Sequence, residues 1–246
     1  MARQSDELKR YILSLPPESI WRPVHDHGGT LLRRGGGKFA DILPETLEDI
    51  RLAGRGVVDL GCNLGAYALL AARQGAARVV GVDIDLSVIT GCRMLARDHG
   101  LRNIEFKVVD FLKTDLGERF DLGMLIDFIG RSVVAKGKVR ACLEALMRVS
   151  RQEMLLTLRP EYHVRDGLGC ASSDLEALYP SRFLRQGRML VLEYAAEVLG
   201  QEWELRTDCP GRFKDGNLKT RVRAFRKTPH APDTRDDTHA VKPGIK

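Results

Sequence analysis

The sequence predicts a doubly wound α/β fold built on a mostly parallel sheet, and two observations carry this prediction. From Gly56 onward, short β-branched or apolar runs alternate with amphipathic helical patterns, which is typical of parallel strands joined by helices. The first run, 57–60, leads through two glycines, Gly61 and Gly65, directly into a helical pattern. A tight turn between a strand and a helix places backbone under a ligand, so the fold also predicts a binding site.

The residues before this alternation form an N-terminal extension, 1–54. Ser5 is expected to cap a first helix with an apolar face at Leu8, Tyr11, Ile12 and Leu15, and Pro16-Pro17 stops it. The stretch 21–29 carries too many turn formers for a regular element, and its two histidines, His25 and His27, could belong to a metal site, a lid or a solvated loop.

Two further features of the extension precede the sheet. The basic stretch 33–38 holds three consecutive glycines, so it could clamp an anion or serve as a charged linker. Residues 39–52 have the apolar spacing of an amphipathic helix interrupted by Pro44.

The first strand and its turn favour a cationic ligand. A dinucleotide-binding loop needs three glycines at positions that are here Gly61, Asn63 and Ala66, so only one of the three is present. Asp59, at the end of the strand, would repel a diphosphate and attract an ammonium group. A helix is expected to follow from Ala66 to Gln74.

The next two strands end in acids. The run 78–82 leads to Asp83, 22 residues after Gly61, where a carboxylate would meet two ribose hydroxyls. Asp85 then caps a helix that Gly100 closes. A third strand, 104–109, ends at Asp110, which could also cap the segment that starts at Phe111.

The remaining pattern completes the sheet. We expect strands at 120–127 and 154–158, a loop at 130–137, a helix at 139–149, and an insertion at 159–187 with a short helix near 173–178. A helix at 188–199 and an antiparallel strand pair, 203–206 and 218–227, follow. Residues 228–246, with three prolines and no apolar periodicity, are expected to form a disordered tail.

At these motifs the chain resembles the class I S-adenosylmethionine-dependent methyltransferases, over roughly residues 39–227. Residues 59–65 are similar to the first motif of that family, 81–83 to the second and 108–111 to the third. The resemblance implies a Rossmann-like methyltransferase fold of seven strands with an antiparallel last strand, S-adenosylmethionine as cofactor, and a binding domain over 55–227. It implies cofactor-binding roles for Asp59, Gly61, Cys62, Asn63, Gly65, Asp83, Ile84, Asp110 and Phe111.

The methyl acceptor is expected above the ends of the fourth and fifth strands. Asp127 is the first candidate for a base or an acceptor-orienting group, and Tyr162 and His163 are the next catalytic candidates, with Arg159 and Glu161 beside them. An Asn/Asp-Pro-Pro-aromatic motif is missing at 127–130, which argues against the enzymes that methylate planar amines. Methyl transfer from a sulfonium requires no metal and no covalent nucleophile, and we expect none.

Composition and charge bound the remaining possibilities. The net charge of +6 is concentrated after Leu205, where the sequence contains eleven Lys or Arg and five Asp or Glu. The basic residues Lys219, Arg221 and Arg223 alternate with apolar ones, so that strand face could bind phosphates or face solvent. The five cysteines form no Cys-x-x-Cys pair and are expected to be reduced. No run of transmembrane length or signal peptide is evident, so we expect a cytoplasmic protein.

Four functions are compatible with these residues. A methyltransferase acting on a small molecule is the first interpretation, and an RNA methyltransferase is the second, favoured by the basic carboxyl-terminal region. A cofactor-binding fold without catalysis, serving as a partner or sensor, is the third, and a dehydrogenase is a distant fourth. The acceptor, the methylated atom and the oligomeric state are not specified by the sequence.

Overall fold

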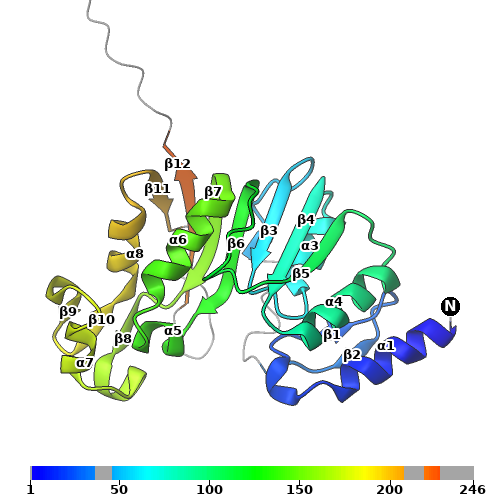
Figure 1. The fold of residues 1–246 in the computed structure, drawn as a ribbon, viewed down its shortest axis with the longest axis horizontal. Coiled ribbons are helices and arrows are strands. Elements are labelled where there is room, and N and C mark those ends of the chain that lie inside the picture. Colours follow the sequence, from blue (N-terminus) through cyan, green and yellow to red (C-terminus); the bar gives the residue numbers. More distant parts are fainter. Residues whose placement is uncertain (1, 37–45, 208–218, 228–246) are drawn as a thin grey trace, which may run out of the picture.

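The computed structural model describes residues 2–36, 46–207 and 219–227. Its centre is a seven-stranded sheet of order β11-β12-β7-β6-β3-β4-β5, in which β12 is antiparallel to both of its neighbours and the other adjacent pairs are parallel (Figure 1). The fold class predicted from the sequence is confirmed. The strands are β3 (Gly56–Leu60), β4 (Arg78–Asp83), β5 (Ile104–Val108), β6 (Phe120–Ile129), β7 (Ser150–Leu158), β11 (Trp203–Arg206) and β12 (Thr220–Arg226).

The central strands are apolar on both sides because helices cover both faces of the sheet. In β3, Val57 faces one cluster of buried side chains and Val58 faces the other. The parallel register pairs Val57 with Val79 of β4 and with Leu122 of β6. The carboxyl ends of these parallel strands therefore meet at one edge, which is the lower edge in Figure 1.

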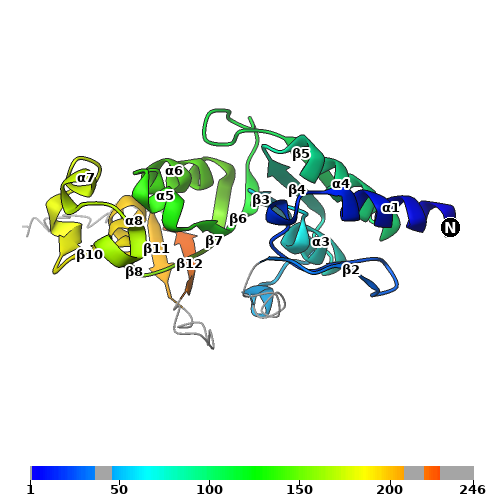
Figure 2. The ribbon, with the colours of Figure 1, turned by 90° about the horizontal axis from the view of Figure 1, so that it is seen from below.

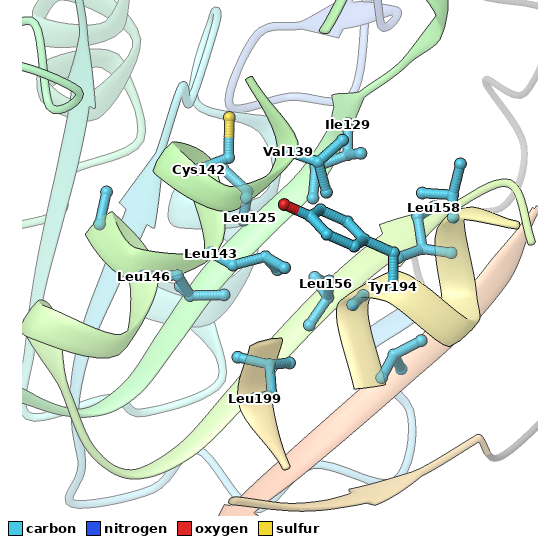
Figure 3. Close-up of a cluster of buried hydrophobic side chains, with 14 of the residues drawn as sticks. Leu125, Ile129, Val139, Cys142, Leu143, Leu146, Leu156, Leu158, Tyr194 and Leu199 are labelled. Carbon is cyan, nitrogen blue, oxygen red and sulfur yellow. The ribbon is translucent and has the colours of Figure 1, made fainter. Parts of the chain in front are cut away.

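Each face of the sheet has its own set of helices. The first set is α1 (Ala2–Ser14), α3 (Ala66–Arg73) and α4 (Leu86–Asp98), and the second is α5 (Arg131–Ala135), α6 (Val139–Val149) and α8 (Val191–Leu199). Figure 2 shows the two sets at opposite ends of the molecule. Figure 3 shows how α6 and α8 pack on β6 and β7, with Leu143 and Leu156 fully buried between them.

The N-terminal extension is part of this packing. In α1, Leu8 and Ile12 are buried in the same cluster as Val88 and Ile89 of α4. The helix begins at Ala2, so Ser5 lies inside it and does not cap it. After a 3-10 turn, η1 (Pro17–Ser19), the stretch expected to be irregular contains a short hairpin, because β1 (Val24–His25) pairs with β2 (Leu31–Arg33).

Side chains stabilise the amino end of α4 and the carboxyl end of α1. The Asp85 carboxylate accepts hydrogen bonds from the backbone amides of Ser87 and Val88, which caps α4 as predicted. Arg33, expected to be a clamp or a linker charge, donates to the carbonyl oxygens of Ile12, Leu13 and Leu15 at 2.9, 3.1 and 2.5 Å. It thereby satisfies the carboxyl end of α1, where unpaired carbonyls attract a cation.

The boundaries of several elements differ from the expectation. The stretch 130–137 contains α5, and 188–190 forms a strand, β10 (Arg188–Leu190), so α8 begins at Val191. In the insertion, β10 pairs with β8 (Glu161–His163) and β9 (Leu184–Arg185), and hydrogen bonding to β8 explains why the helix starts late. The insertion also holds a π-helical turn, η3 (Val164–Leu168), a 3-10 turn, η4 (Ser181–Phe183), and the short helix α7 (Ser172–Glu176).

Some expectations fall outside the described residues. Residues 39–45, half of the helix expected over 39–52, are among them. In the described half only residues 46–47 are helical, and Leu47, Ile50 and Leu52 are buried. The tail at 228–246 and Cys209 also lie outside. The other four cysteines are free thiols, three of them buried. Within the residues that the structure describes, no helix combines the length and the apolar character needed to cross a membrane.

Candidate functional site

A cavity of about 440 Å³ lies at the carboxyl ends of β3, β4 and β6, where a doubly wound sheet binds its ligands. The segment Ser19–His25, called the wall segment below, lines the cavity on the side away from these strand ends. The residues that line the cavity include the following predicted site residues: Asp59, Gly61, Cys62, Asn63, Asp83 and Asp127.

The turn from β3 into α3 requires glycine at two positions. Gly61 has φ +69°, and a Cβ at this position would lie 2.5 Å from the ring of Phe128. Gly65, just before α3, has φ +73° and would clash with Phe106 at 2.8 Å. Both positions combine left-handed backbone with a tight neighbour, so any side chain would deform the loop.

Asp59 is a buried acid on this cavity. Its residue is 2% exposed, and its Oδ2 accepts no hydrogen bond from the part of the chain that the structure describes. Burial, and next the nearby charge of Asp83, raise the pKa of Asp59 to about 8. A buried carboxylate oxygen without a donor is costly, and a cationic group in the cavity would relieve that cost. The ammonium group of S-adenosylmethionine fits this requirement.

Asp83 is held in place by backbone amides on both carboxylate oxygens. Its Oδ2 accepts from the backbone amide of Asn63 at 2.9 Å, and its Oδ1 accepts from that of Asp85 at 3.1 Å. Each oxygen retains a lone pair for a further donor. Such an acid, fixed at the end of β4 on the cavity, is suited to accept hydrogen bonds from a pair of hydroxyls.

Asn63 links the turn to the wall segment. It has φ +49°, a conformation that asparagine tolerates better than most residues. Its side chain donates to the carbonyl oxygen of Ser19 at 2.7 Å and accepts from the backbone amide of Trp21 at 3.3 Å. Asparagine in place of the usual glycine therefore provides two hydrogen bonds that glycine could not.

The remaining predicted cofactor residues do not line the cavity. The Asp110 carboxylate accepts from the backbone amide of Leu112 at 3.2 Å and pairs with Lys113. The segment that starts at Phe111 is a turn and not the helix that Asp110 could cap. Phe111 is buried and packs edge-on against Phe128 at 5.0 Å between ring centroids. Ile84 is 67% exposed, which makes it an accessible apolar side chain directly after Asp83.

Asp127 is the centre of an ion cluster that joins distant parts of the chain. Its Oδ2 pairs with Arg22 of the wall segment, and its Oδ1 pairs with Lys219 at 2.6 Å. The Thr157 hydroxyl donates to Oδ1 at 3.2 Å and accepts from the Asp127 backbone amide at 2.7 Å. Asp127 itself has φ +58°, so the backbone adopts an uncommon conformation to present this carboxylate.

These cations decide the ionisation of Asp127. Burial alone raises its pKa, but the charges and hydrogen bonds of Lys219 and Arg22 outweigh burial and leave the pKa below its ordinary value. Such a carboxylate stays ionised and is a weak proton acceptor. Tyr67 packs beside the cluster, with Arg22 5.5 Å from its ring centroid, and burial raises the pKa of its hydroxyl to about 12.

The other catalytic candidates, Tyr162 and His163, are not brought to the cavity. Both lie in β8 of the insertion. Tyr162 is buried in the cluster beneath α8, with Arg159 5.2 Å from its ring centroid. His163 is exposed, and Glu161 pairs with Arg188. The insertion follows the carboxyl end of β7 as expected, but none of its residues lines the cavity.

The histidines of the extension have local partners. The His27 ring contacts the Asp98 carboxylate at 3.3 Å, and the carbonyl oxygen of His25 lies 3.2 Å from the His99 ring. In residues 2–36, 46–207 and 219–227, no three metal-ligating side chains are grouped to hold an ion.

The basic face of β12 is neither a solvent face nor an open phosphate site. Lys219 pairs with Asp127, Arg221 with Asp49 at 3.2 Å, and Arg223 with Glu153 at 2.6 Å. Arg221 is 9% exposed. The sequence does not indicate these pairs, because the two partners of each pair lie far apart along the chain and no local pattern predicts their contact. For the same reason it does not indicate that Arg22 lines the cavity.

Comparisons with known proteins agree with this architecture. Residues 53–197 match the family model of a methyltransferase domain. A ribosomal protein L11 methyltransferase from Aliivibrio salmonicida is 46% identical over 59 residues, which is 24% of this chain and 19% of that protein. The chain thus covers about a fifth of the length of this relative.

Two solved structures share the fold at low sequence identity. Magnesium protoporphyrin IX methyltransferase from Synechocystis PCC 6803 with bound S-adenosylhomocysteine is 20% identical, with a TM-score of 0.53 over 76% of this chain and 80% of that one. The bifunctional kinase-methyltransferase WbdD is 19% identical, with a TM-score of 0.60 over 89% of this chain and 46% of that one.

Proposed function

The chain belongs to the methyltransferase-domain family whose model spans residues 53–197, and from this premise we propose that it holds its cofactor against Asp59 and Asp83 and methylates a small molecule. The chain carries a methyltransferase domain over residues 53–197, and its cofactor, its acceptor and its site residues are the subject of the proposal. The cytoplasmic location expected from the sequence stays a prediction.

Asp59 carries the cofactor assignment. It is an acid on the cavity whose buried Oδ2 has no donor among the residues that the structure describes, and a cofactor ammonium would supply a charge partner. The Asp83 carboxylate would accept the ribose hydroxyls, and the exposed Ile84 beside it would contact the adenine. Gly61, Cys62 and Asn63 would offer bare backbone along the cofactor. The roles expected for Gly65, Asp110 and Phe111 stay predictions.

In this arrangement the cofactor brings the reactive methyl group as a sulfonium, and the protein supplies position and electrostatics. The wall segment excludes water from one side of the cavity. Asp59 fixes one end of the cofactor, and Asp83 fixes another. Asp127, with its proton affinity lowered by two cations, would position groups at the acceptor end and would not remove protons.

A small acceptor is favoured over RNA by the ion pairs of β12. The basic face of β12, which favoured RNA in the sequence, is occupied by Asp127, Asp49 and Glu153. A protein acceptor is the second candidate, because the curated relative is named for a ribosomal protein.

The cofactor assignment is tested by calorimetric titration of S-adenosylmethionine and S-adenosylhomocysteine. We expect wild-type protein to bind both at micromolar concentrations, and Asp83→Ala and Asp59→Asn each to weaken binding at least tenfold, about 1.4 kcal/mol. Asp166→Asn, on the exposed side of η3, is the control and should bind normally. Unchanged affinity in both cavity variants would contradict the assignment.

The acceptor class is tested with labelled S-adenosylmethionine. Transfer is measured separately to a metabolite pool that passes a small-molecule filter, to tRNA and to ribosomal protein. We expect label in the filtered metabolites. Label in RNA or ribosomal protein alone would replace the small-molecule proposal with one of the alternatives.

A further inference from the structure

Two cations, Arg22 and Lys219, already hold a carboxylate, that of Asp127, and this pair of cations is called the grip below. Arg22 contacts one oxygen of Asp127, and Lys219 contacts the other at 2.6 Å. The side chains of the two cations are 12% and 25% exposed, so they are largely withdrawn from water. Arginine and lysine placed on opposite oxygens are a common way to bind a carboxylate with defined orientation.

Arg22, one of the two cations of the grip, lies on the same cavity as the cofactor residues. Arg22 and Asp127 both line the cavity that Asp59 and Asp83 line. Tyr67 lines the same cavity, and the charges of Arg22, Asp127 and Asp59 all act on the pKa of its hydroxyl. A group bound at the grip therefore shares the cavity with the cofactor.

The surroundings of the grip are apolar and aromatic. Ile126, Phe128 and Val133 line the cavity next to Asp127, and Trp21 of the wall segment, 59% exposed, lines it beside Arg22. This surface would pack against a ring or an aliphatic body and leave a single charged group to meet the cations.

An acceptor with a cationic amine does not fit as well. Both oxygens of Asp127 already have cationic partners, so a substrate ammonium would have to displace Arg22 or Lys219 and leave that cation near a like charge. A substrate carboxylate would instead replace one anion by another. When a cation leaves Asp127 for the substrate carboxylate, the Thr157 hydroxyl still donates to Asp127. This hydrogen bond lowers the free-energy cost of leaving the Asp127 carboxylate without that cation.

We propose that Arg22 and Lys219 bind the carboxylate of an acceptor acid with an apolar or aromatic body, and that Asp127 occupies their grip until the acceptor arrives. This inference rests on the proposed function and names the class of its small-molecule substrate. Asp127 is a positioning residue that prepares the two cations.

The reaction balances without a catalytic base. An oxygen of the acceptor carboxylate forms a bond to the methyl carbon as the bond from that carbon to sulfur breaks, and the electron pair of the broken bond stays on sulfur. The negative charge of the acceptor and the positive charge of the sulfonium cancel, giving a methyl ester and S-adenosylhomocysteine. No proton moves in this step.

Binding of benzoate and of its cationic counterpart benzylammonium tests the proposal by calorimetry, with and without saturating S-adenosylhomocysteine. Wild-type protein should prefer benzoate. Arg22→Gln and Lys219→Met should each weaken benzoate binding at least tenfold, whereas Asp127→Asn, which removes the competing carboxylate, should strengthen it at least tenfold. Arg73→Gln, which removes a charge from the same cavity beside His99, should change the affinity less than twofold.

The outcomes separate this proposal from the cofactor assignment. Failure of S-adenosylhomocysteine to bind, with benzoate bound as expected, would overturn the proposed function and leave the carboxylate grip standing. Absence of benzoate binding by Asp127→Asn would overturn the grip. If benzylammonium binds to the wild-type protein and Asp127→Asn abolishes that binding, Asp127 is the residue that binds a cationic acceptor. This outcome would also overturn the proposed carboxylate grip. Circular dichroism of each variant checks that the fold is retained.

Discussion

At the scale of single residues, the buried Asp59 carboxyl lowers the stability of the fold, whereas the same carboxyl is proposed to strengthen cofactor binding. Its pKa rises from 3.8 to about 8 in the folded protein, mainly through burial. Between these values the unfolded chain has released the proton that the folded chain keeps, so the free energy of unfolding falls as pH rises. A carboxylate retained at such a cost is typical of a binding site.

We therefore predict that Asp59→Asn stabilises the cofactor-free protein. The gain should be absent near pH 4 and grow toward pH 8 to a few kcal/mol, because only the wild-type protein carries the penalty. Thermal unfolding of both proteins across this pH range measures the difference. Equal pH dependence of the two curves would contradict a raised pKa at Asp59.

A second residue-scale prediction concerns Asn63. Replacing it by glycine keeps the positive φ without strain and removes only the two hydrogen bonds to the wall segment. We expect amide hydrogen exchange at Trp21 to become faster, by a factor corresponding to ~1–3 kcal/mol. Asn103→Ala, which removes hydrogen bonds to Ala72 and Ala76, should leave Trp21 unchanged. Unaltered exchange in Asn63→Gly would mean that other contacts hold the wall segment.

The sequence reveals residues whose role depends on local pattern. Asp59, Gly61 and Asp83 follow strands at fixed spacing, and the structure brings them to one cavity. Arg22 and Lys219 carry no such signal, since they meet Asp127 across 105 and 92 residues of chain. Tyr162 and His163 come soon after β7 in the sequence, but they lie in β8, which pairs with β10 and does not reach the cavity.

At the scale of elements, β12 shows how charge on a strand can serve internal structure. Its basic side chains alternate as a solvent face would, yet they meet carboxylates of other elements. Glu153 of β7, 4% exposed, accepts from Arg55 and Arg223, each at 2.7 Å. The two strands and the start of β3 are thereby tied by charge as well as by backbone hydrogen bonds.

We predict that Glu153→Gln destabilises the protein by ~2–4 kcal/mol, because it leaves two largely buried guanidinium groups without that charge. Urea unfolding provides the measurement. Glu105→Gln is the matched control: its carboxylate pairs with Arg78 and Lys107 but is 54% exposed, and the cost should stay below about 1 kcal/mol. Equal losses of stability in the two variants would show that burial of the Glu153 ion pairs does not increase their contribution to the free energy of unfolding.

Element types were predictable where periodicity was long, and boundaries were not. The strands at β3, β4 and β5 and the helix α4 lie where apolar runs and the Asp85 cap place them. The strand β10 was mistaken for the start of α8, because Arg188–Leu190 fits a helical pattern and its pairing with β8 is a tertiary contact. The sequence does not reveal the hairpin β1-β2, because strands of two and three residues have no measurable period.

At the scale of the whole molecule, the N-terminal extension and one face of the sheet form a continuous packed structure. Ile12 of α1 is fully buried, and it belongs to the cluster that contains Val57 of β3 and Ile89 of α4. The hydroxyl of Tyr11 also donates to the carbonyl oxygen of Ser87 at 2.9 Å. Residues on both sides of position 54 thus contribute to one cluster of buried side chains, and the predicted domain division stays a prediction.

From this continuity we predict that Ile12→Ala lowers the stability of the entire protein by ~2–4 kcal/mol, the usual cost of such a cavity. Differential scanning calorimetry should show one transition that moves to lower temperature as a unit. Leu13→Ala is the control, since the neighbouring side chain is 51% exposed and its loss should shift the transition little. If α1 were an independent appendage, Ile12→Ala would move only a small early transition and leave the main one in place. Because the wall segment continues from α1 to the cavity, a single shared transition would also mean that the cavity forms only when the whole core does.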